Sequence, residues 1–297
     1  MTSVAILISN PAAPAVDTEL LAAIAAALPQ AGATRWLNSA IAAEVPFARS
    51  DVPLNEIEAR LRTIIGDRPV DLAILPQAQR RKKLLLADMD STMIEQECID
   101  ELAAFVGLKQ EVSAITARAM RGEIAFEPAL RERVALLKDL PLSVVDTIIA
   151  RHITYIPGGK TLIATMKANG SYTALVSGGF TVFTAPIGKA LGFHEDRANI
   201  LELDGDKLAG LVREPILGKE AKRERLLELR AEKGLKQEET MAVGDGANDL
   251  AMLDEAGLGV ALHAKPAVAA AADVRIDHGD LTALLYLQGY ASDAFIA

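Results

Sequence analysis

From residue 84 onward, short apolar runs alternate with segments of helical pattern, and this alternation limits the fold more than any other feature of the chain. The runs at 84–87, 172–176, 240–243 and 259–262 are rich in Leu, Val and Ala, as is usual for strands buried on both faces of a parallel sheet. Segments with helical periodicity follow these runs. We therefore predict a doubly wound α/β domain with a parallel sheet.

Two regions depart from this alternation. Residues 1–80 read as strand, helix, two short strands, helix and strand, an order that predicts a ferredoxin-like α+β unit. The basic stretch 79–83 is predicted to be a solvated linker to a second unit, residues 81–297. Within the second unit, residues 96–155 carry mostly helical patterns and predict an all-helical insertion.

The charge balance narrows the classes of partner. The chain has 40 Asp and Glu against 31 Lys and Arg, a net charge of −9, which argues against a nucleic-acid partner because such proteins present a basic face. The single cysteine, Cys98, excludes an intrachain disulfide, as expected in a reducing compartment. We expect neither a signal peptide nor a membrane partner, since the apolar stretch 20–28 is too short to span a bilayer, and we expect a cytoplasmic location.

The first motif that suggests chemistry is Asp88-Met89-Asp90, which follows the apolar run 84–87. Alternate residues at a strand end can face one site, so the two carboxylates would share a small volume. Such a pair is costly unless a divalent cation neutralises it, and oxygen ligands suit Mg²⁺. One carboxylate could attack phosphorus while the other moves protons. Taken alone, the motif is more often part of a turn or a helix N-cap.

Two further features point to an anion. Ser177-Gly178-Gly179 ends an apolar run and leads into a helical pattern, where a hydroxyl and consecutive N–H groups can form a phosphate cradle. By itself the motif is more often a plain turn. Lys222 lies on the charged helical segment 220–233, where pattern alone makes it a surface residue.

The most informative segment is Gly244-Asp245-Gly246-Ala247-Asn248-Asp249, which follows the run 240–243 and opens a helix. Its two glycines permit tight backbone geometry. Asp245 would add a third carboxylate to the metal site, and Asn248 and Asp249 could orient the ligands. A simple turn would not need this composition.

Together these elements resemble the haloacid dehalogenase superfamily, whose DxDxT motif supplies a nucleophile and an acid/base. The resemblance implies that Asp88 is the nucleophile, Asp90 the acid/base, and Asp88, Asp90 and Asp245 the Mg²⁺ ligands. It also implies that the phosphate is bound by the following residues, with Asp249 as a supporting residue: Ser177, Gly178, Lys222 and Asn248.

Within the superfamily, the chain is most similar to the phosphoserine phosphatase family over roughly residues 84–290. The similarity rests on four segments: DMDSTMIEQECIDELA (88–103), LRERVALLKDLP (130–141), VSGGF (176–180) and VGDGANDLAML (243–253). It implies that Glu97 and Arg133 of the helical cap hold the ammonium and carboxylate of the substrate, a pairing that makes chemical sense. The first 80 residues are similar to the ACT-like domain of longer members of the family.

The implied activity is Mg²⁺-dependent hydrolysis of O-phospho-L-serine through an aspartyl-phosphate on Asp88, the last step of serine biosynthesis. One alternative is a phosphatase or phosphomutase for another small phosphomonoester. Another is a non-catalytic regulator that binds an amino acid, which the intact Asp88 and Asp90 disfavour. The sequence leaves the oligomeric state open, with a homodimer as one alternative.

Overall fold

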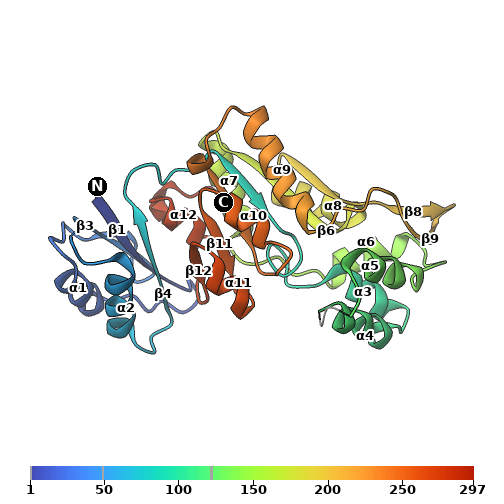
Figure 1. Ribbon diagram of the computed structural model, residues 1–297, viewed down its shortest axis with the longest axis horizontal. Helices are drawn as coiled ribbons and strands as arrows, with labels where there is room; N and C mark the ends of the chain where they lie inside the picture. The colour runs from blue at the N-terminus through green and yellow to red at the C-terminus, as the bar shows by residue number, and fades with distance from the viewer. Residues whose placement is uncertain (1, 49, 121–122) are drawn as a thin grey trace.

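The computed structural model describes residues 2–48, 50–120 and 123–297. Figure 1 shows three parts in a row, with the N-terminal unit at one end, a parallel sheet in the middle and a group of helices at the other end. None of the helices in these ranges is long and apolar enough to cross a membrane.

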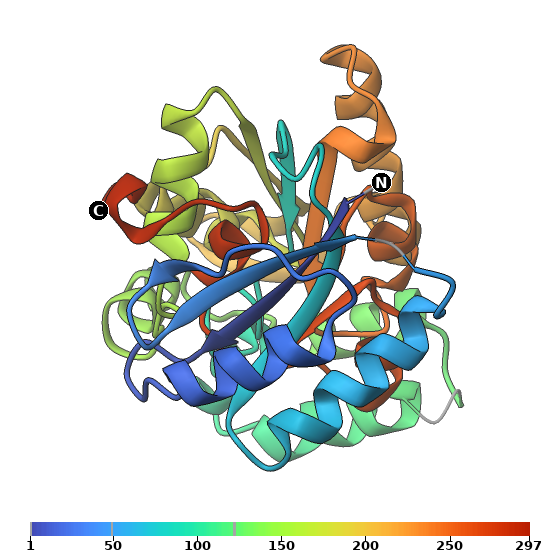
Figure 2. The ribbon, with the colours of Figure 1, turned by 90° about the vertical axis from the view of Figure 1, so that its left-hand side faces the viewer.

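The N-terminal unit has the βαββαβ order predicted from the sequence. Its elements are β1 (Thr2–Ser9), α1 (Thr18–Ala27), β2 (Arg35–Asn38), β3 (Ala42–Ala48), α2 (Leu54–Ile65) and β4 (Val70–Pro76). The strands pair antiparallel in the order β2-β3-β1-β4. In Figure 2, α1 and α2 cover the face of this sheet that points away from the rest of the molecule. The ferredoxin-like prediction is therefore confirmed.

The central sheet is parallel, as the alternation predicted, with the order β12-β11-β10-β5-β6-β7. Its strands are β5 (Leu84–Ala87), β6 (Tyr172–Phe180), β7 (Glu195–Asn199), β10 (Thr240–Gly244), β11 (Gly259–Leu262) and β12 (Val274–Ile276). The helices around it are α7 (Gly159–Ala168), α8 (Thr181–Leu191), α9 (Lys219–Glu232), α10 (Leu250–Glu255), α11 (Pro266–Ala271) and α12 (Ala283–Leu287). Because β5 lies between β10 and β6, the chain segments that leave these three strands meet at one edge of the sheet.

In its described residues, the predicted helical insertion forms four helices between β5 and α7. They are α3 (Cys98–Phe105), α4 (Lys109–Met120), α5 (Phe126–Ala135) and α6 (Ser143–Arg151), which we call the cap. An antiparallel hairpin, β8 (Leu201–Asp204) and β9 (Lys207–Val212), extends from the central sheet to the cap (Figure 1). The hairpin pairs with the cap segment 139–142: Asp139 N–H donates to the Leu208 carbonyl, Leu208 N–H to that of Leu140, and Leu142 N–H to that of Asp206.

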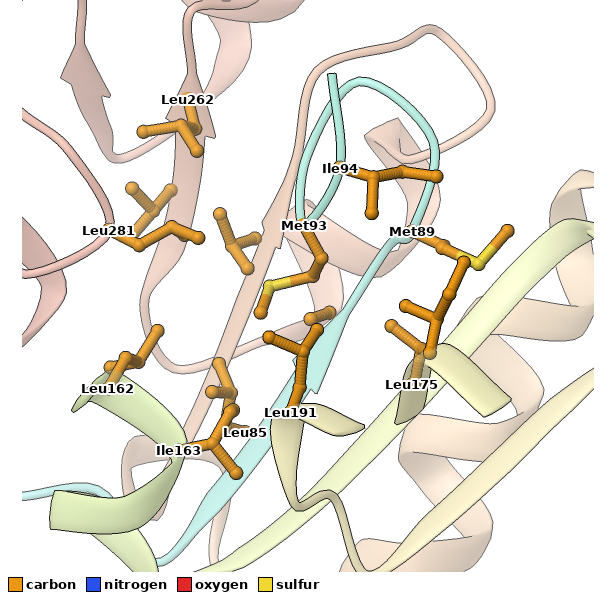
Figure 3. Close-up of a cluster of buried hydrophobic side chains, with 14 of the residues drawn as sticks. Leu85, Met89, Met93, Ile94, Leu162, Ile163, Leu175, Leu191, Leu262 and Leu281 are labelled. Atoms are coloured by element: carbon orange, nitrogen blue, oxygen red, sulfur yellow. The ribbon is translucent and has the colours of Figure 1, made fainter. Parts of the chain in front are cut away.

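A continuous hydrophobic core lies beneath the edge where β5 ends. Figure 3 shows Met89, Met93 and Ile94, which follow β5 directly, packed among apolar side chains of the surrounding elements. The neighbours include Leu162, Ile163, Leu175, Leu191, Leu262 and Leu281. Residues on both sides of Asp88 are therefore fixed by burial, which holds this carboxylate in a defined place.

The N-terminal sheet also packs against the central unit. The side chains of Val4, Ile6 and Ile8 on β1 belong to the same buried cluster as Tyr286 of α12. Asn38 donates a hydrogen bond of 2.8 Å to the Tyr286 hydroxyl.

The stretch 79–83 is only in part the solvated linker that its charges predicted, because Gln79, Arg81 and Lys83 are exposed whereas Arg80 and Lys82 are largely enclosed. The Arg80 side chain is 9% exposed and pairs with Glu44 at 2.8 Å, while Lys82 is buried and donates from Nζ to the Glu238 carbonyl. Arg81 stacks on the Tyr290 ring. Charge runs are usually solvated, but Arg80 and Lys82 instead satisfy acceptors at the junction of the two units.

Candidate active site

Asp88 is the first residue after β5, and its surroundings are set by the two neighbouring strands. Its N–H donates to the Val243 carbonyl of β10 at 3.0 Å, which continues the parallel ladder by one residue. The side chain is buried, and its Oδ1 accepts a hydrogen bond of 2.8 Å from the Met89 N–H. The carboxylate is thus held at the point where the loop 244–249 also leaves the sheet.

Lys222 is buried on α9 and reaches this edge with its ammonium group. Its Nζ lies 2.6 Å from Oδ1 of Asp88 and 2.6 Å from Oδ1 of Asp249. The two carboxylates raise the pKa of Lys222 despite its burial, so this lysine is charged. The sequence pattern made Lys222 a surface residue, and only the family resemblance identified it.

The loop 244–249 is shaped around Asp249. The Gly246 N–H donates to Asp249 Oδ2 at 3.0 Å, and a Cβ atom at Gly244 or Gly246 would overlap the Asp249 or Asn248 side chain. Both glycines are therefore needed because the Asp249 and Asn248 side chains fold back over the backbone. Asn248 itself is exposed, above Gly246.

Three carboxylates converge at this edge. Single oxygens of Asp88, Asp245 and Asp249 lie within 4.8 Å of one another, and in the described part of the chain this is the group of acidic side chains spaced for a metal ion. Burial and the charge of Asp249 raise the pKa of Asp88 and raise that of Asp245 to about 6, because the nearby lysines, Lys222 for both and Lys265 for Asp245, do not offset these effects. This oxygen-rich, under-neutralised set fits Mg²⁺. The predicted metal ligands were Asp88, Asp90 and Asp245; the Asp90 side chain lies outside this group and Asp249 lies within it.

The Asp90 carboxyl faces the cap. Its Oδ2 accepts a hydrogen bond of 3.2 Å from the Cys98 N–H, while Oδ1 is buried without a hydrogen-bond partner among the described residues. Burial, and then the nearby charge of Glu97, raise the pKa of Asp90 to about 7. A carboxyl with this pKa can hold a proton near neutral pH and release it again.

The turn Ser177-Gly178-Gly179 lies beside Asp90. Ser177 is buried, and its Oγ accepts a hydrogen bond of 2.9 Å from the Gly179 N–H. A Cβ atom placed on Gly179 would lie 3.5 Å from Asp90 Oδ2, so the backbone of this turn approaches the carboxyl closely. The predicted cradle and the predicted acid/base are therefore neighbours.

Two residues of the cap complete the predicted set. Glu97 is exposed at the start of α3, and its Oε1 accepts a hydrogen bond of 2.9 Å from the Ser91 hydroxyl. Arg133 on α5 is half-buried and donates to the Ala129 carbonyl and to the Thr116 hydroxyl, each at 3.2 Å. Burial lowers the pKa of Arg133, whereas the charges of Asp100 and Glu97 act in the opposite direction, so Glu97 and Arg133 lie within electrostatic reach of each other.

One polar residue near this edge, Asn199, was not predicted from the sequence. Asn199 at the end of β7 is 2% exposed and bonds to backbone groups of two loops that flank the site. A single asparagine in the segment EDRAN belongs to no motif, and its partners Gly178 and Leu217 are distant in sequence. The strand that carries Asn199 was not among the predicted strands either, so no local pattern pointed to this residue.

Comparisons with known proteins agree with this geometry. The family model of haloacid dehalogenase-like hydrolases matches residues 85–254. A probable phosphoserine phosphatase of Schizosaccharomyces pombe is 46% identical over 224 residues, which are 74% of this chain and 75% of that protein. The unliganded crystal structure of a probable phosphoserine phosphatase from Vibrio cholerae has a TM-score of 0.76 at 31% identity and covers 98% of this chain and 88% of that one.

A further solved structure is similar to the central unit and cap. It is a phospho-aspartyl intermediate analogue of a phosphoserine phosphatase, with a TM-score of 0.64 and 43% identity, and the match covers 69% of this chain and 98% of that chain.

Proposed function

Since the chain belongs to the haloacid dehalogenase-like hydrolases and, among them, to the phosphoserine phosphatase family, we propose that it hydrolyses O-phospho-L-serine to L-serine and phosphate. This reaction is the last step of serine biosynthesis, and we place the enzyme in the cytoplasm. The observation that carries the proposal is the buried Asp88 carboxylate, held 2.6 Å from Lys222 and next to an Asp90 whose pKa is about 7. A nucleophile, a cation and a proton carrier thus meet at one strand end.

In the first step, an Asp88 carboxylate oxygen attacks phosphorus, the bond from phosphorus to the serine oxygen breaks, and Asp90 passes its proton to that oxygen. Aspartyl-phosphate and serine result. In the second step, Asp90 takes a proton from water, the water oxygen attacks phosphorus, and the bond to Asp88 breaks to release phosphate. The phospho-aspartyl intermediate analogue of a phosphoserine phosphatase that is 43% identical to this chain supports the covalent route.

The remaining groups stabilise charge on the phosphoryl oxygens. Asp88, Asp245 and Asp249 would hold Mg²⁺, which supplies positive charge near those oxygens when it is bound. Lys222 adds a fixed positive charge, and the Ser177 hydroxyl with the Gly178 backbone supplies hydrogen-bond donors. Asn248, which is exposed in the loop 244–249, contributes a side-chain amide to the bound substrate. The Asp90 carboxyl faces the cap, so Asp90 remains a proposed metal ligand only through its backbone carbonyl.

Substrate selection belongs to the cap. We assign the substrate ammonium to Glu97 and its carboxylate to Arg133, because these opposite charges of the cap lie within electrostatic reach of each other and Glu97 also acts on the Asp90 carboxyl. Closure of the cap over a small substrate would keep water from the first step. A small phosphomonoester that lacks an ammonium and a carboxylate group would leave the charges of Glu97 and Arg133 without partners in the substrate.

The test compares L-phosphoserine with phosphothreonine, glycerol phosphate and p-nitrophenyl phosphate, with and without Mg²⁺. We expect L-phosphoserine to have the highest kcat/KM, and Arg133→Ala to lower it about 10- to 150-fold, as for a lost charged hydrogen bond, with little effect on p-nitrophenyl phosphate. Arg131→Ala is the matched control, since Arg131 is on the same helix but exposed and paired with Glu127 and Glu214. Equal losses on both substrates would remove Arg133 from the specificity role, and a different best substrate would contradict the assignment.

A further inference from the structure

The phosphate-binding turn lies where strand β6 departs from regular pairing with β7. Val176 pairs with Arg197 and Phe180 pairs with Asn199, so the three residues 177–179 face the single residue Ala198. Extra residues in a strand displace the backbone from the ladder and leave its polar groups without regular partners. The turn 177–179 therefore needs support from outside the sheet.

Asn199 supplies that support with its side-chain amide. Its Nδ2 donates to the Gly178 carbonyl at 2.9 Å and to the Leu217 carbonyl at 3.3 Å, and its Oδ1 accepts from the Leu217 N–H at 2.7 Å. One buried side chain thus joins the cradle to the segment just before α9. Gly218 is the N-cap of α9, so Leu217 fixes where this helix starts and therefore where Lys222 lies, about one turn further on.

The same two loops also contact the cap. A Cβ atom on Gly178 would lie 3.7 Å from Cζ of Phe126, and one on Gly218 would lie 3.8 Å from Cδ1 of the same ring. Phe126, at the start of α5, therefore lies across both glycines. Asn199 joins these two loops, so it also determines how the surface that contacts the Phe126 ring is arranged.

We propose that Asn199 is a positioning residue that holds the phosphate cradle at Ser177 and Gly178 in register with the helix that carries Lys222. The inference rests on the proposed phosphatase function and adds a residue to it. Asn199 does not touch the phosphoryl group. It acts through the Gly178 carbonyl, which is part of the peptide next to the donors of the cradle, and through Leu217.

The test measures phosphate binding separately from turnover. Asn199→Asp keeps the shape and the acceptor for the Leu217 N–H but replaces two donated hydrogen bonds by a carboxylate facing two carbonyls. We expect the Kd for inorganic phosphate, measured by titration calorimetry of the Mg²⁺-loaded enzyme, and the KM for p-nitrophenyl phosphate both to rise about tenfold, as for one to two lost hydrogen bonds. The control is Asn169→Asp, whose Nδ2 donates to the Thr165 carbonyl of α7, and it should stay within about twofold of wild type.

Phosphate affinity separates this role from a purely structural one. If folded Asn199→Asp binds phosphate as tightly as wild type and only its Tm falls, the proposal is wrong. If Asn199→Asp yields no soluble protein, Asn199→Ser, which keeps one small donor, should weaken phosphate binding in the same direction, and unchanged affinity there would equally overturn the proposal. Neither the Kd for inorganic phosphate nor the KM for p-nitrophenyl phosphate depends on phosphoserine. A wrong substrate assignment would therefore not be mistaken for failure of the proposal on Asn199.

Discussion

Asp88 and Asp90 are two residues apart and have different environments. Asp88 is paired with Lys222, whose charge opposes the rise in the Asp88 pKa, while Asp90 lies against the cap without a positive partner at hydrogen-bond distance among the described residues. The difference arises because alternate residues at the strand end reach different neighbours, α9 for one and the start of α3 for the other. Two identical side chains can therefore have separate roles.

Substitution by asparagine should distinguish these roles. Asp88→Asn removes the attacking oxygen anion, so activity should fall to background and no phosphoenzyme should form. Asp90→Asn keeps the nucleophile but cannot transfer a proton, so phosphoserine turnover should fall about 10²–10⁴-fold. With p-nitrophenyl phosphate, whose leaving group needs no proton, acid-quenched phosphoenzyme should accumulate in Asp90→Asn. Accumulation in Asp88→Asn instead would mean that the two roles are reversed.

At the scale of elements, the cap returns to the central unit through Pro157 and Gly158, where α7 begins. The Leu281 N–H donates to the Pro157 carbonyl, and a Cβ atom on Gly158 would lie 2.7 Å from the backbone nitrogen of Thr282. Gly158 also has a φ of +80°, which suits glycine. The junction is thus fixed by backbone contact with the segment just before α12.

Gly158→Ala tests this contact against a matched glycine. Gly170 also has a φ of +80° but no atom within 4 Å of an added Cβ, so Gly170→Ala reports only the cost of the left-handed conformation, about 1–2 kcal/mol. Gly158→Ala should lose a further 1–3 kcal/mol or so, because backbone must move to admit the methyl group. Urea unfolding of both variants measures the difference, and equal losses would show that the Thr282 contact has no energetic weight.

Most helices and strands could be predicted from the sequence, because they depend on patterns of neighbouring residues. The runs 84–87 and 240–243 are buried strands because their side chains are apolar on both faces, and the acidic residues after them had to lie at one edge. The buried state of Lys222 could not be predicted this way, because it depends on Asp88 and Asp249, which are distant in sequence. Asn199 was missed for the same reason.

At the scale of the whole molecule, the N-terminal sheet is fastened to the central unit by a buried carboxylate. Asp71 on β4 accepts hydrogen bonds from the N–H groups of Asp277, His278 and Gly279, at 2.7 to 3.2 Å, in the turn after β12. This contact was not expected from a chain divided at residues 79–83. An acidic residue within the apolar segment VDLAIL was the one local sign of it.

Asp71→Ala should weaken this attachment. Three N–H groups would lose their acceptor, so the free energy of unfolding should fall by about 1–3 kcal/mol. Trp36, the single tryptophan, lies on β2, so its fluorescence follows the N-terminal sheet while far-ultraviolet circular dichroism follows the whole chain. We expect the fluorescence midpoint in urea to fall further than the dichroism midpoint. Asp67→Ala, at an exposed position, is the control, and a midpoint for Asp71→Ala equal to that of this control would contradict the prediction.

The hairpin β8–β9 has a consequence for how the cap can move. Backbone pairing attaches the cap to the central unit at two places. One is the bridge between Ile94 and Tyr155, and the other is the pairing of the segment 139–142 with the hairpin. A body held at one place can swing in any direction, whereas a body held at two places turns only about the line between them. Amide hydrogens of Asp139, Leu142 and Leu208 should therefore exchange with solvent together, as one cooperative unit, and at a rate set by release of the hairpin rather than by opening of the substrate entrance.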